Sequence, residues 1–307
     1  MVTSVTRIFA DDTKVYGKAS SVEVRVKLQE DINELADWSD KRLLKFNTSK
    51  CSVMHLGHNN PCHVYHMRDN DGNDRQLDET EVEKDLGLHV DKKLSFHQHV
   101  SQTVTKANRT LGLMKRTFVS RDNTVIKRLY TTMVRPILEY GNAPRTHQFA
   151  GDIDKLERVQ RRATKMCRDI RDLSYEMRLK KLDLPSLYYR RQRGDMIQTF
   201  KILTGKDQID QDKLLPLSHT TRTRGHNLKL GKQQGRLNVR KHSFGLRVVN
   251  DWNALPDWVI EAKDINQFKN RLDLFWKDRK YVTRPTHAQT SSVRRPEREL
   301  QASAFFL

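Results

Sequence analysis

The character of the chain changes near residue 96, and this change constrains the fold more than any single motif. Before it, short runs of strand-forming residues alternate with turns and one helical segment. After it, apolar residues recur at spacings of three and four, the pattern of helices that pack on one face. Residues 1–96 contain 14 Lys and Arg and 17 Asp and Glu, a net charge of −3, whereas the remainder contain 43 and 21, a net charge of +22. We therefore expect an α+β part followed by a mostly α-helical part.

Composition narrows the class of protein. Of 307 residues, 36% are hydrophobic and 31% are charged, so we expect an elongated or partner-dependent chain with nucleic acid as the simplest partner for its basic part. Cys51, Cys62 and Cys167 form no CxxC pair. This predicts a reducing, intracellular location. The sequence contains no apolar run of membrane-spanning length and no signal-peptide pattern, so we expect no membrane association.

The first motif is an adjacent pair of carboxylates, Asp11 and Asp12, between two short strand-forming runs, Thr6–Ala10 and Thr13–Tyr16. The pattern predicts a hairpin with both acids at its tight turn. Mg²⁺ prefers oxygen ligands, including one or two carboxylates, so such a turn suits phosphoryl transfer. Aspartate is also common in turns for purely structural reasons, because it hydrogen-bonds its own backbone there.

Further elements follow in order. Ser20–Leu44 has helical periodicity and should pack on a sheet, with Trp38 in the core. Cys51–Leu56 predicts a strand, and Asn70-Asp71-Gly72 predicts the turn of a hairpin. Leu86-Gly87-Leu88 should lie on another short ribbon.

Three motifs together resemble the latter half of the palm of a reverse transcriptase, most closely those of non-LTR (LINE-type) retrotransposons. They are Phe9-Ala10-Asp11-Asp12, then Phe46–Cys51, then Asp85–Leu88; the likeness continues over Leu129–Gly141 and Phe244–Pro256, to about Tyr281. The resemblance implies RNA-directed DNA synthesis with Mg²⁺ from a deoxynucleoside triphosphate, on an RNA template with a DNA primer, and a nuclear location. It implies that Asp11 and Asp12 are catalytic metal ligands, that Lys50 is catalytic, and that Leu86, Gly87 and Leu88 form the primer grip.

Two assignments have alternatives. Lys50 is either a proton donor or charge partner for departing pyrophosphate, or a solvated surface lysine. A group of Cys and His residues is either a zinc site or a set of strand and loop side chains without metal, and its spacing favours the second interpretation. The group consists of His55, His58, Cys62, His63 and His66.

The helical part should resemble a polymerase thumb, which grips the duplex through its phosphates. Helices are expected from His97, over about Asn123–Tyr140 with a kink at Pro136, and over about Asp152–Asp169. Their cations either bind nucleic acid or only solubilise the helices, and the net charge of the remainder favours binding. The candidates are Lys106, Arg109, Lys115, Arg116, Arg158, Arg161, Arg162, Lys165 and Arg168.

A further basic helix is expected over Asp183–Gly205. In it, Tyr188 and Tyr189 either stack on bases or lie half-buried, beside Arg190 and Arg191 as two more binding candidates. We divide the chain into a partial palm (1–96), a thumb-like region (97–205), a basic linker (206–241), a small helical module (242–281) and a disordered tail (282–307).

These expectations define two classes of function. The first is the C-terminal portion of an RNA-directed DNA polymerase. The alternative is a noncatalytic RNA- or DNA-binding protein derived from a retrotransposon. Apart from these two functions, the chain could be a decayed product that does not fold stably.

The first prediction concerns polymerisation. A two-metal site needs a further carboxylate between the ions, and in the resembled family it lies on an earlier strand with the fingers, which do not fit in Met1–Ala10. We expect this polypeptide alone to give no primer extension on an RNA template with Mg²⁺. Extension above background that disappears in Asp11→Ala would contradict this.

Overall fold

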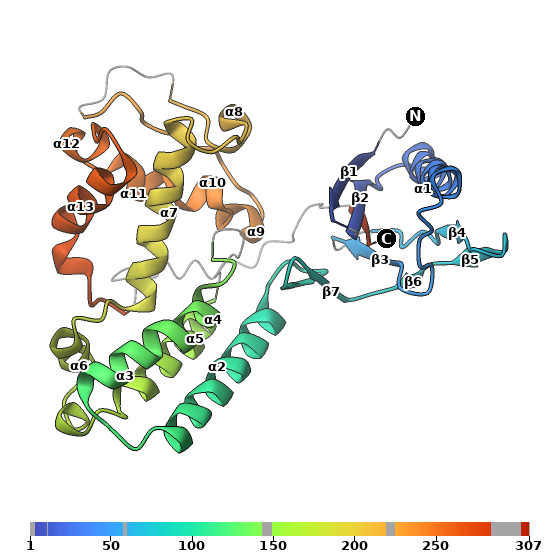
Figure 1. Cartoon of the computed structure of the whole chain (residues 1–307). Helices are drawn as coiled ribbons and strands as arrows, with labels where there is room; N and C mark the ends of the chain where they lie inside the picture. Colours follow the sequence, from blue (N-terminus) through green and yellow to red (C-terminus); the bar gives the residue numbers. More distant parts are fainter. Residues whose placement is uncertain are drawn as a thin grey trace. The chain divides into compact units, whose positions relative to one another are not determined.

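The computed structural model describes residues 4–10, 12–57, 60–142, 149–218, 225–283 and 302–306 (Figure 1). It is mixed α/β, with 52% of residues helical and 13% in strands, which is consistent with the α+β class. The chain divides into two compact units. The sheet unit comprises Met1–Ser95 and Arg294–Leu307, and the helical unit comprises Phe96–Val293.

The sheet unit contains a five-stranded sheet in the order β1-β2-β9-β3-β6. Its strands are β1 (Val5–Phe9), β2 (Asp12–Lys18), β3 (Ser52–Leu56), β6 (Asp78–Glu79) and β9 (Ala302–Phe306). The β1–β2 pair is antiparallel, β9 runs antiparallel to both β2 and β3, and β3 pairs with β6 in parallel.

Helix α1 (Val22–Arg42) provides the other half of this core. The Ser21 hydroxyl accepts a hydrogen bond from the Val24 N–H and caps the helix. The apolar face expected from the sequence is buried, and it packs with Val15 and Val53 of the sheet; its members are Leu28, Ile32, Leu35 and Ala36.

The core position expected for Trp38 is wrong, because its side chain is 45% exposed. At 100° per residue, Trp38 lies well away from the centre of the Leu28–Leu35 stripe, while Ser39 lies near that centre and is buried. The Ser39 hydroxyl donates to the carbonyl of Leu44 at 2.7 Å, which satisfies it in the core.

The tail also differs from expectation. Residues 282–307 were expected to be disordered, but Ala302–Phe306 forms β9 and pairs on both sides, with β2 and with β3. A strand between two others satisfies the backbone hydrogen bonds of both neighbours. This pairing partner is far away in sequence, so local composition did not indicate it.

Two hairpins complete the sheet unit. Strands β4 (His66–Arg68) and β5 (Asp74–Gln76) flank the predicted Asn70-Asp71-Gly72 turn, and Gly72 has a φ of +85° there. Strands β7 (Val82–Asp85) and β8 (Leu88–Asp91) form the second hairpin, with Asp85 paired to Leu88. Both hairpins were predicted correctly.

The helical unit has two cores. The first core lies between helices α2 to α6, and its apolar residues include Ala107, Leu111, Leu156 and Val159. These helices are α2 (His97–Thr117), α3 (Asn123–Leu129), α4 (Arg135–Glu139), α5 (Ala150–Thr164) and α6 (Tyr175–Leu182). A π-helical turn, Tyr130–Val134, separates α3 from α4. Pro136, which has no N–H to donate, lies in the first turn of α4 just after this segment, and a kink of the helix axis there stays a prediction.

The second core is built around Trp252, Phe268 and Phe200, the last from α7 (Leu187–Leu203). The other helices here are α8 (Gln211–Leu214), α9 (Asn238–Lys241), α10 (Phe244–Arg247), α11 (Val249–Asn253), α12 (Asp257–Ile260) and α13 (Ile265–Phe275). The segment 206–241, expected to be a linker, instead contributes to this core, because Leu215 and Leu230 are buried there. The described structure also has no domain boundary at residue 205, where the thumb-like region was expected to end, since α7 packs against α13 within the same unit.

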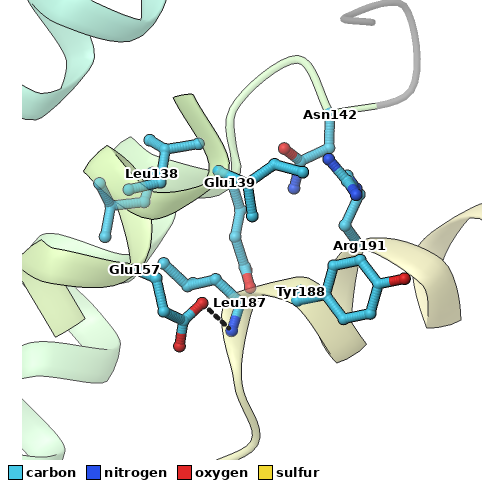
Figure 2. Close-up of a pocket in the computed structure, with 9 residues that line it drawn as sticks. Leu138, Glu139, Asn142, Glu157, Leu187, Tyr188 and Arg191 are labelled. Atoms are coloured by element: carbon cyan, nitrogen blue, oxygen red, sulfur yellow. Dashed lines mark hydrogen bonds between the residues drawn. The ribbon is translucent and has the colours of Figure 1, made fainter. Parts of the chain in front are cut away.

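A buried carboxylate joins the two cores. Glu157 of α5 accepts a hydrogen bond from the Tyr175 hydroxyl at 2.6 Å. It accepts a second from the Leu187 N–H at 3.2 Å, at the first turn of α7 (Figure 2). Leu187 packs on the first core and Tyr189 belongs to the second. Burial raises the pKa of Glu157 to about 7, despite these hydrogen bonds.

The second prediction concerns stability against pH. Because the pKa of Glu157 rises from 4.5 to about 7 on folding, its contribution is greatest when it is protonated and is lost between these two values as the pH increases. The wild-type chain should lose up to about 3 kcal/mol through this residue between about pH 4.5 and pH 7. Glu157→Gln should remove that loss, and urea unfolding followed by circular dichroism across the pH range measures it.

The matched control is Glu176→Gln. Glu176 is exposed on α6 and pairs with Lys180, so its replacement should change the pH dependence by less than about 0.5 kcal/mol. Equal pH profiles for wild-type protein and Glu157→Gln would show that Glu157 does not carry this dependence.

Candidate functional site

The β1–β2 hairpin presents Asp12 at its turn. Phe9 pairs with Asp12, and Ala10, with a φ of +54°, follows the first strand. Asp11 lies outside the described residues, whereas Asp12 is the first residue of β2 and is exposed. The hairpin predicted from the sequence is therefore confirmed, and the assignment of its acids to Mg²⁺ stays a prediction.

Lys50 lies in the turn between α1 and β3. Its N–H donates to the carbonyl of Asn47 at 2.8 Å, and its side chain is exposed. Asn47 also accepts hydrogen bonds from the N–H and the hydroxyl of Ser49, at 3.2 and 2.6 Å, which fixes this turn. Both interpretations of the lysine fit an exposed side chain.

The predicted primer-grip residues form the tip of the β7–β8 hairpin. Leu86 and Gly87 have φ values of +45° and +78°, so the turn is left-handed at both positions. Leucine rarely adopts this conformation, and here its side chain is 47% exposed. The tip is tied to the first hairpin, because Lys14 of β2 forms an ion pair with Asp85 next to Leu86. The structure thus brings Leu86–Leu88 near the strand that begins at Asp12.

A third feature is a set of cations on α2 and α5, which lie in contact in the helical unit (Figure 1). Every one is exposed, and within the described parts of the chain none forms an ion pair with a carboxylate. The Arg162 guanidinium donates to the Asn108 amide oxygen at 2.7 Å and links the two helices. We call this set the α2–α5 cationic face: Lys106, Arg109, Lys115, Arg116, Arg158, Arg161, Arg162, Lys165 and Arg168, the last two just after α5.

Gly112 adds a groove to the α2 side of this face. It lies between Arg109 and Arg116 on the same side of the helix, and all three line one shallow pocket with Thr105 and Asn108. A Cβ atom at Gly112 would meet nothing within 4 Å, so packing within the chain does not require glycine here. Glycine in a helix interior costs about 1 kcal/mol relative to alanine. A helix surface without a side chain lets another molecule approach the backbone closely.

The other two binding candidates, Arg190 and Arg191, do not join the cationic face. Arg190 binds both carboxylate oxygens of Glu139, one through Nε and the other through Nη2 at 3.0 Å. Arg191 is half-buried with its guanidinium 5.5 Å from the centroid of the Tyr188 ring, and burial lowers its pKa (Figure 2). Tyr189 is buried and donates its hydroxyl hydrogen to Asp273 at 2.8 Å, which places it in the core.

The histidine group expected before residue 67 does not gather as a whole. His58 lies outside the described residues, and the N–H of His66 donates to the Gln29 side chain at 2.9 Å. His63 stacks its ring edge-on against Tyr65, with centroids 4.9 Å apart. His55 and Cys62 do approach each other, together with Glu79, which the sequence analysis did not select.

Comparison with known proteins adds no family assignment: no family model matches the chain, and neither the curated proteins nor the solved structures gave a match. Among the helices that the structure describes, none combines the length and apolar character needed to cross a bilayer.

The third prediction contrasts two arginines. Arg190→Gln leaves the Glu139 carboxylate half-buried without its bidentate partner, and we expect a loss of about 1–2 kcal/mol in the free energy of unfolding. Arg158→Gln, on the exposed face, should change it by less than about 0.5 kcal/mol. Urea unfolding of both variants measures the difference. Equal losses would contradict the distinction between a structural and a surface arginine.

Proposed function

We propose that this chain binds the sugar–phosphate backbone of nucleic acid through the α2–α5 cationic face, as the hairpin-and-thumb portion of an RNA-directed DNA polymerase of the non-LTR retrotransposon type. The observation that carries the proposal is that nine exposed Lys and Arg side chains, on two adjacent helices and in the turn just after the second, lack carboxylate partners in the described structure. A protein of this charge is expected to satisfy such cations with phosphates.

The geometry supports backbone recognition rather than base readout. The cations follow the outer sides of two packed helices, and Gly112 leaves room between Arg109 and Arg116. Guanidinium groups bind phosphate oxygens in bidentate fashion, and such contacts carry no base information directly. Binding should therefore be largely independent of sequence.

The β1–β2 and β7–β8 hairpins of the sheet unit support the polymerase part of the proposal. Asp12 is exposed at one turn, and Leu86 is exposed at another, with Lys14 and Asp85 tying the hairpins together. In the proposed function Asp11 and Asp12 ligate Mg²⁺, and the Leu86–Leu88 tip supports the primer terminus. A template RNA, a DNA primer and a deoxynucleoside triphosphate are the partners this function needs.

The fourth prediction tests the cationic face with the full chain. Each phosphate neutralised contributes about −0.9 to the slope of log K against log salt on duplex DNA, so four or more contacts imply a loss of roughly a hundredfold or more between about 50 and 200 mM salt. Changing Arg158, Arg161, Arg162 and Arg168 together to Gln should reduce the slope and weaken binding. Fluorescence anisotropy with duplex and single-stranded probes measures both.

The matched control replaces four exposed lysines on other parts of the same unit, so that total charge changes equally. These are Lys181, Lys232, Lys263 and Lys277, all changed to Gln. The control should keep the wild-type slope, while the face variant loses about 0.9 for each contact removed. A flat salt response in the wild-type chain, or equal slopes for the two folded variants, would show that the face only solvates the helices.

A further inference from the structure

Three side chains from separate segments of the sheet unit converge at one point. They are His55 on β3, Cys62 in the loop after it, and Glu79 on β6. Each offers one metal-ligating atom, and these three atoms all lie within 4.8 Å of one another. In a tetrahedral zinc site with ordinary bond lengths, ligand atoms lie about 3.4–3.6 Å apart. Small side-chain rotations at Cys62 and Glu79, both exposed, would close the remaining distance.

The strand register explains why His55 and Glu79 meet. Strands β3 and β6 are parallel, and Val53 lies opposite Glu79. Opposed residues of a parallel pair point to the same face of the sheet, and His55, two residues after Val53, shares that face. The imidazole and the carboxylate are therefore diagonal neighbours on one side of the sheet.

The loop after β3 brings Cys62 close to His55 and Glu79. The Cys62 N–H donates to the Asn60 side chain at 3.1 Å, which fixes the turn, and Cys62 has a φ of +49°. Cys51 and Cys167 are buried, so Cys62 is the exposed thiol among the three cysteines. Cys62 belongs to the sheet unit, whereas the α2–α5 cationic face belongs to the helical unit.

The donor set is selective. A thiolate, an imidazole and one carboxylate suit a divalent transition ion of the zinc class, whereas Mg²⁺ prefers oxygen ligands alone. His55 is buried, and its imidazole offers one ring nitrogen as a ligand atom.

We propose that His55, Cys62 and Glu79 bind one Zn²⁺ ion, with water in the fourth position. The ion joins the loop that contains Cys62 to β3 and β6, which are otherwise paired at only two residue positions. The site is independent of the proposed nucleic-acid binding.

Cobalt substitution of the full chain tests the site, because Co²⁺ with a thiolate ligand gives a charge-transfer absorption band and tetrahedral Co²⁺ gives intense visible bands. We expect one equivalent of Co²⁺ to produce both features and Zn²⁺ to displace it. Cys62→Ser should abolish the charge-transfer band, and, since Cys62 is exposed, the fold should tolerate this change.

Glu79→Gln and Glu81→Gln form a matched pair, since both residues are exposed and two positions apart. Glu79→Gln should weaken Zn²⁺ binding at least about tenfold in competition with a chromophoric chelator, whereas Glu81→Gln should leave it unchanged. Absence of the charge-transfer band in the wild-type chain, its persistence in Cys62→Ser, or equal affinities for the two glutamate variants would overturn the proposal.

Discussion

The helical unit depends on a carboxylate that is buried at the junction of its two cores. Glu157 loses most of its hydration there, and a buried carboxyl group is tolerated only when its oxygens have partners. The Tyr175 hydroxyl supplies one partner, and the first N–H groups of α7 supply the other, where the helix dipole also favours negative charge. Because α7 contributes Leu187 to one core and Tyr189 to the next, its direction at this point determines how both cores are completed.

Local patterns in the sequence predicted the elements whose partners are close along the chain. The β1–β2 and β4–β5 hairpins, α1 and α2 follow from strand-forming runs, turn residues and helical periodicity. The sequence did not indicate β9, because its partners β2 and β3 lie far away along the chain. Leu215 and Leu230 lie in a segment with few other apolar residues, and this composition predicts a linker. Their burial depends on residues that are distant in sequence, such as Trp252. Glu79 was missed because only the β3–β6 register brings it to His55.

The basic residues show that composition alone does not identify a binding surface. A stripe of arginines on α5 and a pair on α7 look alike in sequence, yet Arg158 is exposed and Arg190 is held by Glu139. The difference lies in the neighbours: a carboxylate on α4 reaches α7, whereas the outer side of α5 faces no described acidic partner. A count of cations therefore overestimates the binding surface, because a cation that an internal carboxylate already neutralises adds little to the salt dependence expected for phosphate contacts.

Two hairpin tips of the sheet unit contain a non-glycine residue with a positive φ: Ala10 in the β1–β2 hairpin and Leu86 in the β7–β8 hairpin. Leu86 has a positive φ with its side chain exposed, although glycine or asparagine would adopt that conformation at lower cost. The ion pair between Lys14 and Asp85 fixes this tip relative to the strand that starts at Asp12, so its position does not depend on the turn alone. In the proposed function, the exposed Leu86 side chain on this tethered tip contacts another molecule. In the proposed function that molecule is a primer terminus held near the Asp12 hairpin, and the polymerase proposal depends on this arrangement.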